Sequence, residues 1–123
     1  MDAIAQNSCI RFEPITDATM GRYAAGYMEI ENESGGGCHS VIGRKKDEAK
    51  SAVKLEKKPA AEKTCIAHHV VLHELLHLLG LYHEHQRPDR AKWMDIDLDN
   101  VIEKRRDNYK AIRHIKYSKA VIS

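Results

Sequence analysis

Residues 73–83 decide the fold of this chain, and they read His73-Glu74-Leu75-Leu76-His77-Leu78-Leu79-Gly80-Leu81-Tyr82-His83. Side chains four residues apart lie on one face of a helix, so His73 and His77 can reach a single ion. Gly80 can adopt the left-handed conformation that ends a helix, which lets the chain return His83 to the same ion as third ligand. Three protein ligands leave a fourth position open for water, as in catalytic zinc sites.

Glu74 directly follows the first of these histidines. A carboxylate at this position can hold a metal-bound water without binding the metal, which predicts the role of a general base. A His-Glu-x-x-His motif by itself also occurs by chance in many sequences. The glycine and the third histidine at the correct spacing distinguish this stretch from a chance match.

The continuation of the motif is Glu84-His85-Gln86-Arg87-Pro88-Asp89-Arg90. The whole run 73–90 resembles the zinc-binding signature of the astacin family of secreted zinc endopeptidases, which are metzincins. The resemblance implies an α+β, zincin-like catalytic domain in which a twisted mixed sheet packs on helices, including the zinc-binding helix. It also implies one zinc ion per chain, held by His73, His77 and His83, with Glu74 as the catalytic base. Arg87, Asp89 and Arg90 are expected to form ion pairs of the scaffold.

Length and composition limit the domain count and the class of partner. The chain has 123 residues, 42% of them hydrophobic, which suits one small domain. Its 20 basic and 18 acidic residues give a net charge of +2. This near balance predicts no nucleic-acid or anionic membrane partner. No apolar run approaches the ~20 residues of a membrane span, and the start of the chain does not read as a signal peptide.

The region after His83 is short compared with a complete astacin-like domain. Such domains carry a methionine-containing turn beneath the zinc, well downstream of the third histidine. Only 123 − 83 = 40 residues follow His83, and their one methionine, Met94, comes too early. We therefore expect residues 1–123 to form part of an astacin-like peptidase domain, without its C-terminal portion. Tyr117-Ser118 would mark the approach to the missing turn.

The pattern along the rest of the chain predicts a small mixed sheet and several helices. Alternation of apolar and polar residues predicts strands, and Gly35-Gly36-Gly37 predicts a turn into a short strand. Thr64 is a residue type that caps helices, and the many apolar residues after it predict a zinc helix buried on most sides. Asp97 or Asp99 could cap a later helix. The expected elements are the end of a helix at 2–7, strands at 8–13, 27–31 and 51–56, a turn at 35–44 that enters a short strand, the zinc helix starting at Thr64, and a helical stretch that continues to about 112.

The segment 37–44 resembles a family segment whose strand lies at the edge of the sheet above the cleft. An open edge offers unpaired backbone groups, so the resemblance implies a protein or peptide substrate bound along this strand. His39 stands where the family commonly has an aromatic residue, and we do not expect it to bind metal. Glu56 lies within a lysine-rich stretch that reads as solvated surface. The oligomeric state stays open.

The three cysteines are an odd count. The resemblance implies a disulfide between Cys38 and Cys65, worth about 3 kcal/mol in the chain-entropy model. It also implies that the partner of Cys9 lies in the missing region, which leaves Cys9 as an unpaired thiol. Composition alone would favour three buried, reduced cysteines in a cytosolic protein, but the zinc-binding signature argues against them.

The prediction drawn from the sequence is a secreted, zinc-dependent metalloendopeptidase. One alternative is a zinc-binding fragment or pseudoprotease that acts as an interaction module without hydrolysis. A second is a structural zinc domain, which would close its coordination shell with a fourth protein ligand, His85 or His69.

Overall fold

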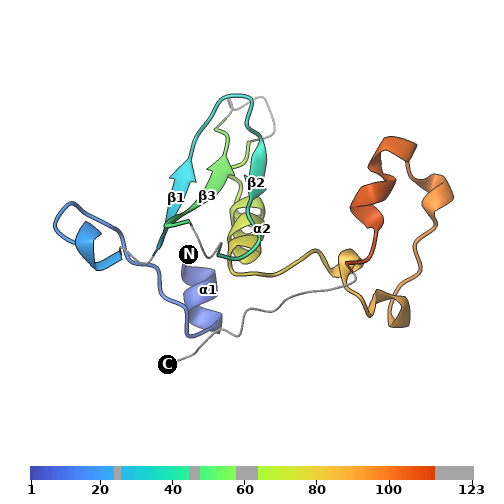
Figure 1. Ribbon diagram of the computed structural model, residues 1–123, viewed down its shortest axis with the longest axis horizontal. Coiled ribbons are helices and arrows are strands. Elements are labelled where there is room, and N and C mark those ends of the chain that lie inside the picture. The colour runs from blue at the N-terminus through green and yellow to red at the C-terminus, as the bar shows by residue number, and fades with distance from the viewer. Residues whose placement is uncertain (24–25, 45–47, 58–63, 113–123) are drawn as a thin grey trace. The chain divides into compact units, whose positions relative to one another are not determined.

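A three-stranded sheet forms around the central strand β3 (Lys50–Leu55). The computed structural model describes residues 1–23, 26–44, 48–57 and 64–112 (Figure 1). β1 (Tyr27–Glu31) pairs with β3 in parallel, and β2 (Cys38–Ser40) pairs with it antiparallel. The strand order β1-β3-β2 places the short strand β2 at an edge of this sheet, as the resemblance implies.

Period-two alternation along β3 builds the core. Ser51, Val53 and Leu55 are buried, whereas the residues between them are partly exposed. Val53 and Leu55 form the core with Cys65. The side chains packed against this cluster come from β1 and from the zinc helix: Met28, Val70, Val71 and Leu78.

The zinc helix, α2 (His68–Leu78), begins four residues later than Thr64, so the predicted start is wrong. The Thr64 hydroxyl accepts a hydrogen bond from the backbone N–H of Ile66, two residues on, and the N–H of Cys65 donates to the carbonyl of Glu56. These bonds and the Cys65 disulfide hold the segment beside the end of β3 in a non-helical conformation.

The expectation that this helix is buried on most sides is also wrong. Glu74, Leu75 and His77 are its buried residues, and the other apolar residues of α2 are only partly covered. The reason is that α2 packs through one face on β2 and β3. A single packing face buries one stripe of a helix.

The N-terminal segment forms α1 (Asp2–Asn7), as predicted, and Ile4 is its buried residue. Residues 8–13 form no strand, which corrects that prediction. The guanidinium group of Arg11 donates to the carbonyls of Ala5, Ser8 and Ile10 at 2.9 Å each. Two carbonyls of the expected strand therefore bond to a side chain and not to a neighbouring strand.

The chain divides into two compact units, Met1–Leu79 and Gly80–Ser123. The second unit contains short 3₁₀ helices, of which Leu98–Asn100 and Glu103–Tyr109 replace the predicted continuous helix. Asp97 caps the first of them by accepting from the N–H of Asp99, so one of the two predicted caps is confirmed. This first helix ends at Asn100 and is followed by Val101, whose backbone is extended. Tyr117-Ser118 lies outside the described residues.

None of the helices in the described part of the chain combines the length and the apolar character needed to cross a membrane.

Candidate metal centre

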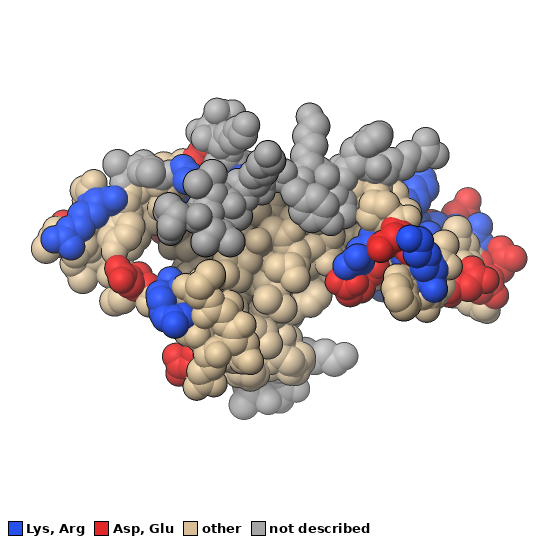
Figure 2. All heavy atoms as spheres, turned by 90° about the horizontal axis from the view of Figure 1, so that it is seen from below, with Lys and Arg blue, Asp and Glu red and all other residues tan. Residues whose placement is uncertain are grey.

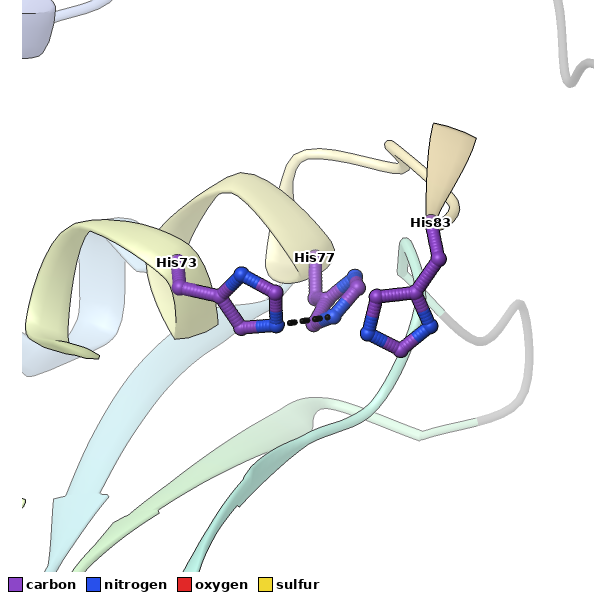
Figure 3. Close-up of side chains that lie close together, drawn as sticks. All are labelled: His73, His77 and His83. Carbon is purple, nitrogen blue, oxygen red and sulfur yellow. Dashed lines mark hydrogen bonds between the residues drawn. The ribbon is translucent and has the colours of Figure 1, made fainter. Parts of the chain in front are cut away.

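His73 and His77 project from the same face of α2, one turn apart (Figure 3). Their Nε2 atoms are 3.0 Å apart, and their rings meet edge to face with centroids 4.4 Å apart. Two imidazole nitrogens this close cannot both direct a lone pair at the other without a proton or a cation between them. The helix thus brings two electron-pair donors to one point.

The third histidine follows the end of this helix. Gly80 has φ +98°, in the left-handed region that the sequence predicts for it. The ring nitrogens available as ligands on His73, His77 and His83 all lie within 4.8 Å of one another. The three side chains differ in burial: His77 is buried, His83 is half-buried and His73 is exposed. The arrangement can hold one cation that solvent can reach.

Glu74 lies between the two helical histidines in the sequence and is only 5% exposed. Within the described part of the chain, no residue donates a hydrogen bond to its carboxylate. No oxygen of the described side chains is both fully shielded and unpartnered, so the carboxylate still meets solvent. A buried carboxylate that faces water can accept a proton from it.

The loop after β2 is fixed to the end of α2. The backbone N–H of Gly43 donates to the carbonyl of His77 at 2.9 Å. The last carbonyls of a helix have no partner within the helix, so a donor from outside stabilises this end. The segment that leads out of the edge strand is thereby joined to a predicted metal ligand.

Glu56 is a residue whose role the sequence does not reveal, and its expected place on a solvated surface is wrong. It is 7% exposed, and its two carboxylate oxygens accept from the N–H of Gly35 at 2.8 Å and of Gly37 at 3.1 Å. These glycines form the turn into β2. Their partner is 19 and 21 residues away, so no local pattern could indicate the contact.

The described residues outside the three-histidine cluster include His39, His69 and His85. His39 is exposed in β2, and its Nδ1 pairs with the carbonyl of Gly36 at 3.0 Å. The Nε2 of His85 pairs with the carbonyl of Asn108 at 3.0 Å. His69 is exposed on α2, and His114 lies outside the described residues.

Ion pairs shape the segment after His83. Arg87 pairs with Asp89 at 3.0 Å, as predicted, and its hydrogen bonds lower the pKa of the Asp89 carboxyl. Arg90 departs from the predicted ion pairing, because its guanidinium donates to the carbonyls of His85 and Tyr109. A guanidinium has several donors in a fixed plane, so it can join two backbone segments in this way.

The disulfide between Cys38 and Cys65 is present in the structure, with Cα atoms 5.5 Å apart. It links the first residue of β2 to the segment that precedes α2. Cys9 is unpaired and exposed, as expected.

Comparison with known proteins places this geometry in a family. The family model for astacin peptidases matches residues 1–122. Zinc metalloproteinase nas-5 of Caenorhabditis elegans is 39% identical over 82% of the chain, and the low choriolytic enzyme of Oryzias latipes is 36% identical over 83%. The chain spans 25% and 32% of the length of these two relatives.

A solved structure shares the fold. High choriolytic enzyme 1, a hatching enzyme zinc-protease from Oryzias latipes, matches with a TM-score of 0.65 and 25% identity. The match covers 85% of this chain and 44% of that one. Together with the family model, which covers nearly every residue, it shows that this chain belongs to the astacin family of peptidases.

Proposed function

We propose that the protein from which this sequence comes is a zinc-dependent metalloendopeptidase that hydrolyses peptide bonds in proteins. The observation that carries the proposal is the convergence of three imidazoles within 4.8 Å, with a buried carboxylate next in sequence to the first of them. Membership of the astacin family and two relatives named as zinc metalloproteinases support it.

The donor set fits zinc. A tetrahedral zinc ion with Zn–N bonds of about 2.0–2.1 Å separates neighbouring ligand nitrogens by roughly 3.3 Å. The Nε2 atoms of His73 and His77 are 3.0 Å apart, close to that separation. Three neutral imidazoles with an open position suit zinc, and hydrolysis needs no redox metal. We propose one ion per chain, held by His73, His77 and His83.

The residues of the chain divide the chemistry between them. Zinc, when bound in such a site, lowers the pKa of a coordinated water to about 7 and polarises a carbonyl oxygen. Glu74 takes the proton of the attacking water at one of its Oε atoms, because its carboxylate faces water and follows His73 directly. The same oxygen then gives the proton to the nitrogen of the leaving amine. Burial of the side chain keeps the carboxylate in place between these two transfers.

The substrate lies along β2 in this proposal. β2 pairs with β3 on one side only among the described residues, so its outer edge presents backbone donors and acceptors. An extended peptide can add to such an edge as another strand. The hydrogen bond between Gly43 and the His77 carbonyl keeps this edge in a fixed relation to α2.

We also propose that the protein acts outside the cell. The observation that supports secretion is the disulfide between Cys38 and Cys65. Disulfides persist in oxidising compartments and are rare in the cytosol.

The test is cleavage of a quenched fluorescent peptide library by the zinc-loaded chain, with cut sites identified by mass spectrometry. Glu74→Gln and an excess of chelator are the controls, and we expect both to abolish cleavage. One equivalent of bound zinc without any cleavage would instead support the alternative, an inactive zinc-binding fragment or pseudoprotease.

A further inference from the structure

We propose that Gln86 is a positioning residue for the metal centre, because it fixes which nitrogen of His83 faces the ion. The inference rests on the proposed function, in which His83 is the third ligand. It goes further by assigning a residue outside the His-Glu-x-x-His motif, and a specific tautomer, to the site.

The backbone first brings Gln86 beside His83. Residues Glu84–Gln86 form a single 3₁₀ turn, and the N–H of Gln86 donates to the carbonyl of His83 at 2.9 Å. Residues three apart in such a turn lie on the same side. The Oε1 of Gln86 consequently lies 3.2 Å from the Nδ1 of His83.

A second contact determines the orientation of the Gln86 amide. Its Nε2 lies 3.0 Å from the carbonyl oxygen of Asn108. A carbonyl oxygen can only accept a hydrogen bond, so the NH₂ end of the amide must face Asn108. The oxygen end must then face His83.

The protonation of His83 follows from this orientation. The Oε1 of an amide can only accept, so the Nδ1 of His83 carries the proton and donates it. The lone pair that binds metal is then on Nε2. Hydrogen bonds of this kind fix the ring of a metal-binding histidine and raise its basicity, and removing them costs about 10–100-fold in metal affinity.

A second segment, residues 108–112, holds Gln86 in its contact with His83. The N–H of Ile112 donates to the carbonyl of Gln86 at 2.8 Å, and the Nε2 of His85 donates to the same Asn108 carbonyl at 3.0 Å. Arg90 joins the carbonyls of His85 and Tyr109. Gln86 is therefore bonded through its backbone and its side chain to the segment 108–112, which resists rotation of its amide.

The experiment compares two variants in a Cys9→Ser background, because the exposed thiol of Cys9 could also bind zinc. Gln86→Met keeps a side chain of similar length and removes both hydrogen bonds. Gln86→Glu keeps an acceptor for His83 and removes the donor to Asn108. Gln6→Met makes the same chemical change on the exposed face of α1 and is the matched control.

Zinc affinity is measured at one pH by competition with a chromophoric chelator. We expect Gln86→Met to weaken binding about 10–100-fold and Gln86→Glu to restore it to within about threefold. Gln6→Met should match the unmodified chain. Equal losses in Gln86→Met and Gln86→Glu would mean that only the anchor to Asn108 matters and would overturn the proposal, as would normal affinity in Gln86→Met.

Nitrogen-15 spectra of the histidine rings in the zinc-loaded chain give a readout that a general loss of stability would not change. We expect His83 to carry its proton on Nδ1. A proton on Nε2 of His83 would refute the assigned tautomer even if neither variant folds. Failure of the unmodified chain to bind zinc would overturn the proposed metal site itself, which separates the two claims.

Discussion

Glu56 and Glu74 are both buried, at 7% and 5% exposed, but their carboxylates differ in their hydrogen bonds and therefore in the roles they can have. The carboxylate of Glu56 accepts two backbone hydrogen bonds from glycines. The carboxylate of Glu74 receives none from the described residues. A carboxylate bonded to fixed donors supports a turn, whereas one that faces water can exchange protons.

For Glu74 we expect substitution by Gln to remove activity and to leave zinc binding intact. The amide has the same shape but cannot accept a proton, and loss of a general base typically costs about 10²–10⁴-fold in rate. Initial rates on the best library peptide and the bound zinc content measure the two effects. His83→Ala is the contrasting variant and should lose both. Retained hydrolysis in Glu74→Gln would show that another group is the base.

For Glu56 we expect substitution by Ala to lower the free energy of unfolding by about 1–3 kcal/mol, because two part-buried N–H groups lose their acceptor. Urea titration followed by circular dichroism measures the change. Glu103→Ala, at an exposed position, is the control and should stay within about 0.5 kcal/mol. Equal stability of both variants would contradict the assigned role.

At this scale the sequence predicts the residues whose roles depend on local spacing. The three histidines and Gly80 follow helix and turn geometry, so their convergence can be anticipated. The role of Glu56 cannot be anticipated, because its partners are about twenty residues distant and lysines stand nearby in the sequence at positions 54, 57 and 58. The role of Gln86 is equally hidden although it lies three residues from His83, since its amide orientation depends on Asn108.

Apolar–polar periodicity predicts some helices and strands of this chain correctly and others wrongly. The predicted strands 27–31 and 51–56 match the structure to within one residue, because alternation in a half-buried strand is strong. The predicted start of α2 is too early because a threonine at the end of a loop resembles a cap. Residues 8–13 alternate like a strand, but the Arg11 side chain takes up two of their carbonyls.

The disulfide acts on these elements by tying β2 to the approach of α2. We expect a Cys38→Ser, Cys65→Ser double variant to unfold with a free energy lower by about 3–4 kcal/mol, since a loop of 27 residues is released in the unfolded chain. Urea titration with and without reductant measures it. Cys9→Ser should have the same free energy of unfolding as the unmodified chain, both with and without reductant. Identical curves for the reduced and oxidised chain would refute a stabilising role.

At the scale of the whole molecule, the face drawn in Figure 2 carries basic and acidic side chains close to one another. Lys50 lies between Glu29 and Glu31, at 2.6 and 2.9 Å, and both carboxylates raise its pKa. In the second unit, Arg87 pairs with Asp89 and Lys110 with Asp107. Such exposed pairs contribute little stability each, so they keep the surface locally neutral and do not determine the fold.

Metal binding should stabilise the whole chain in a concentration-dependent way. A ligand that binds only the folded state adds about 2.7 kcal/mol at a free concentration of 100 times Kd. We expect Tm to rise with zinc and to fall when chelator is added. His73→Ala should lack the response to zinc. An equal rise in the Tm of His73→Ala with zinc would mean that the ion binds at another site.

The hydrogen bond from Gly43 to the His77 carbonyl has a kinetic consequence. The amide proton of Gly43 can exchange with deuterium only when the loop after β2 separates from the last turn of α2. Its exchange rate therefore reports how often the edge at which we propose that the peptide binds separates from the helix that carries two of the proposed ligands. We expect a peptide inhibitor bound along β2 to slow amide exchange at Gly43 and to leave the exchange rates of the α1 amides unchanged. Equal slowing in α1 would mean that the inhibitor tightens the whole unit.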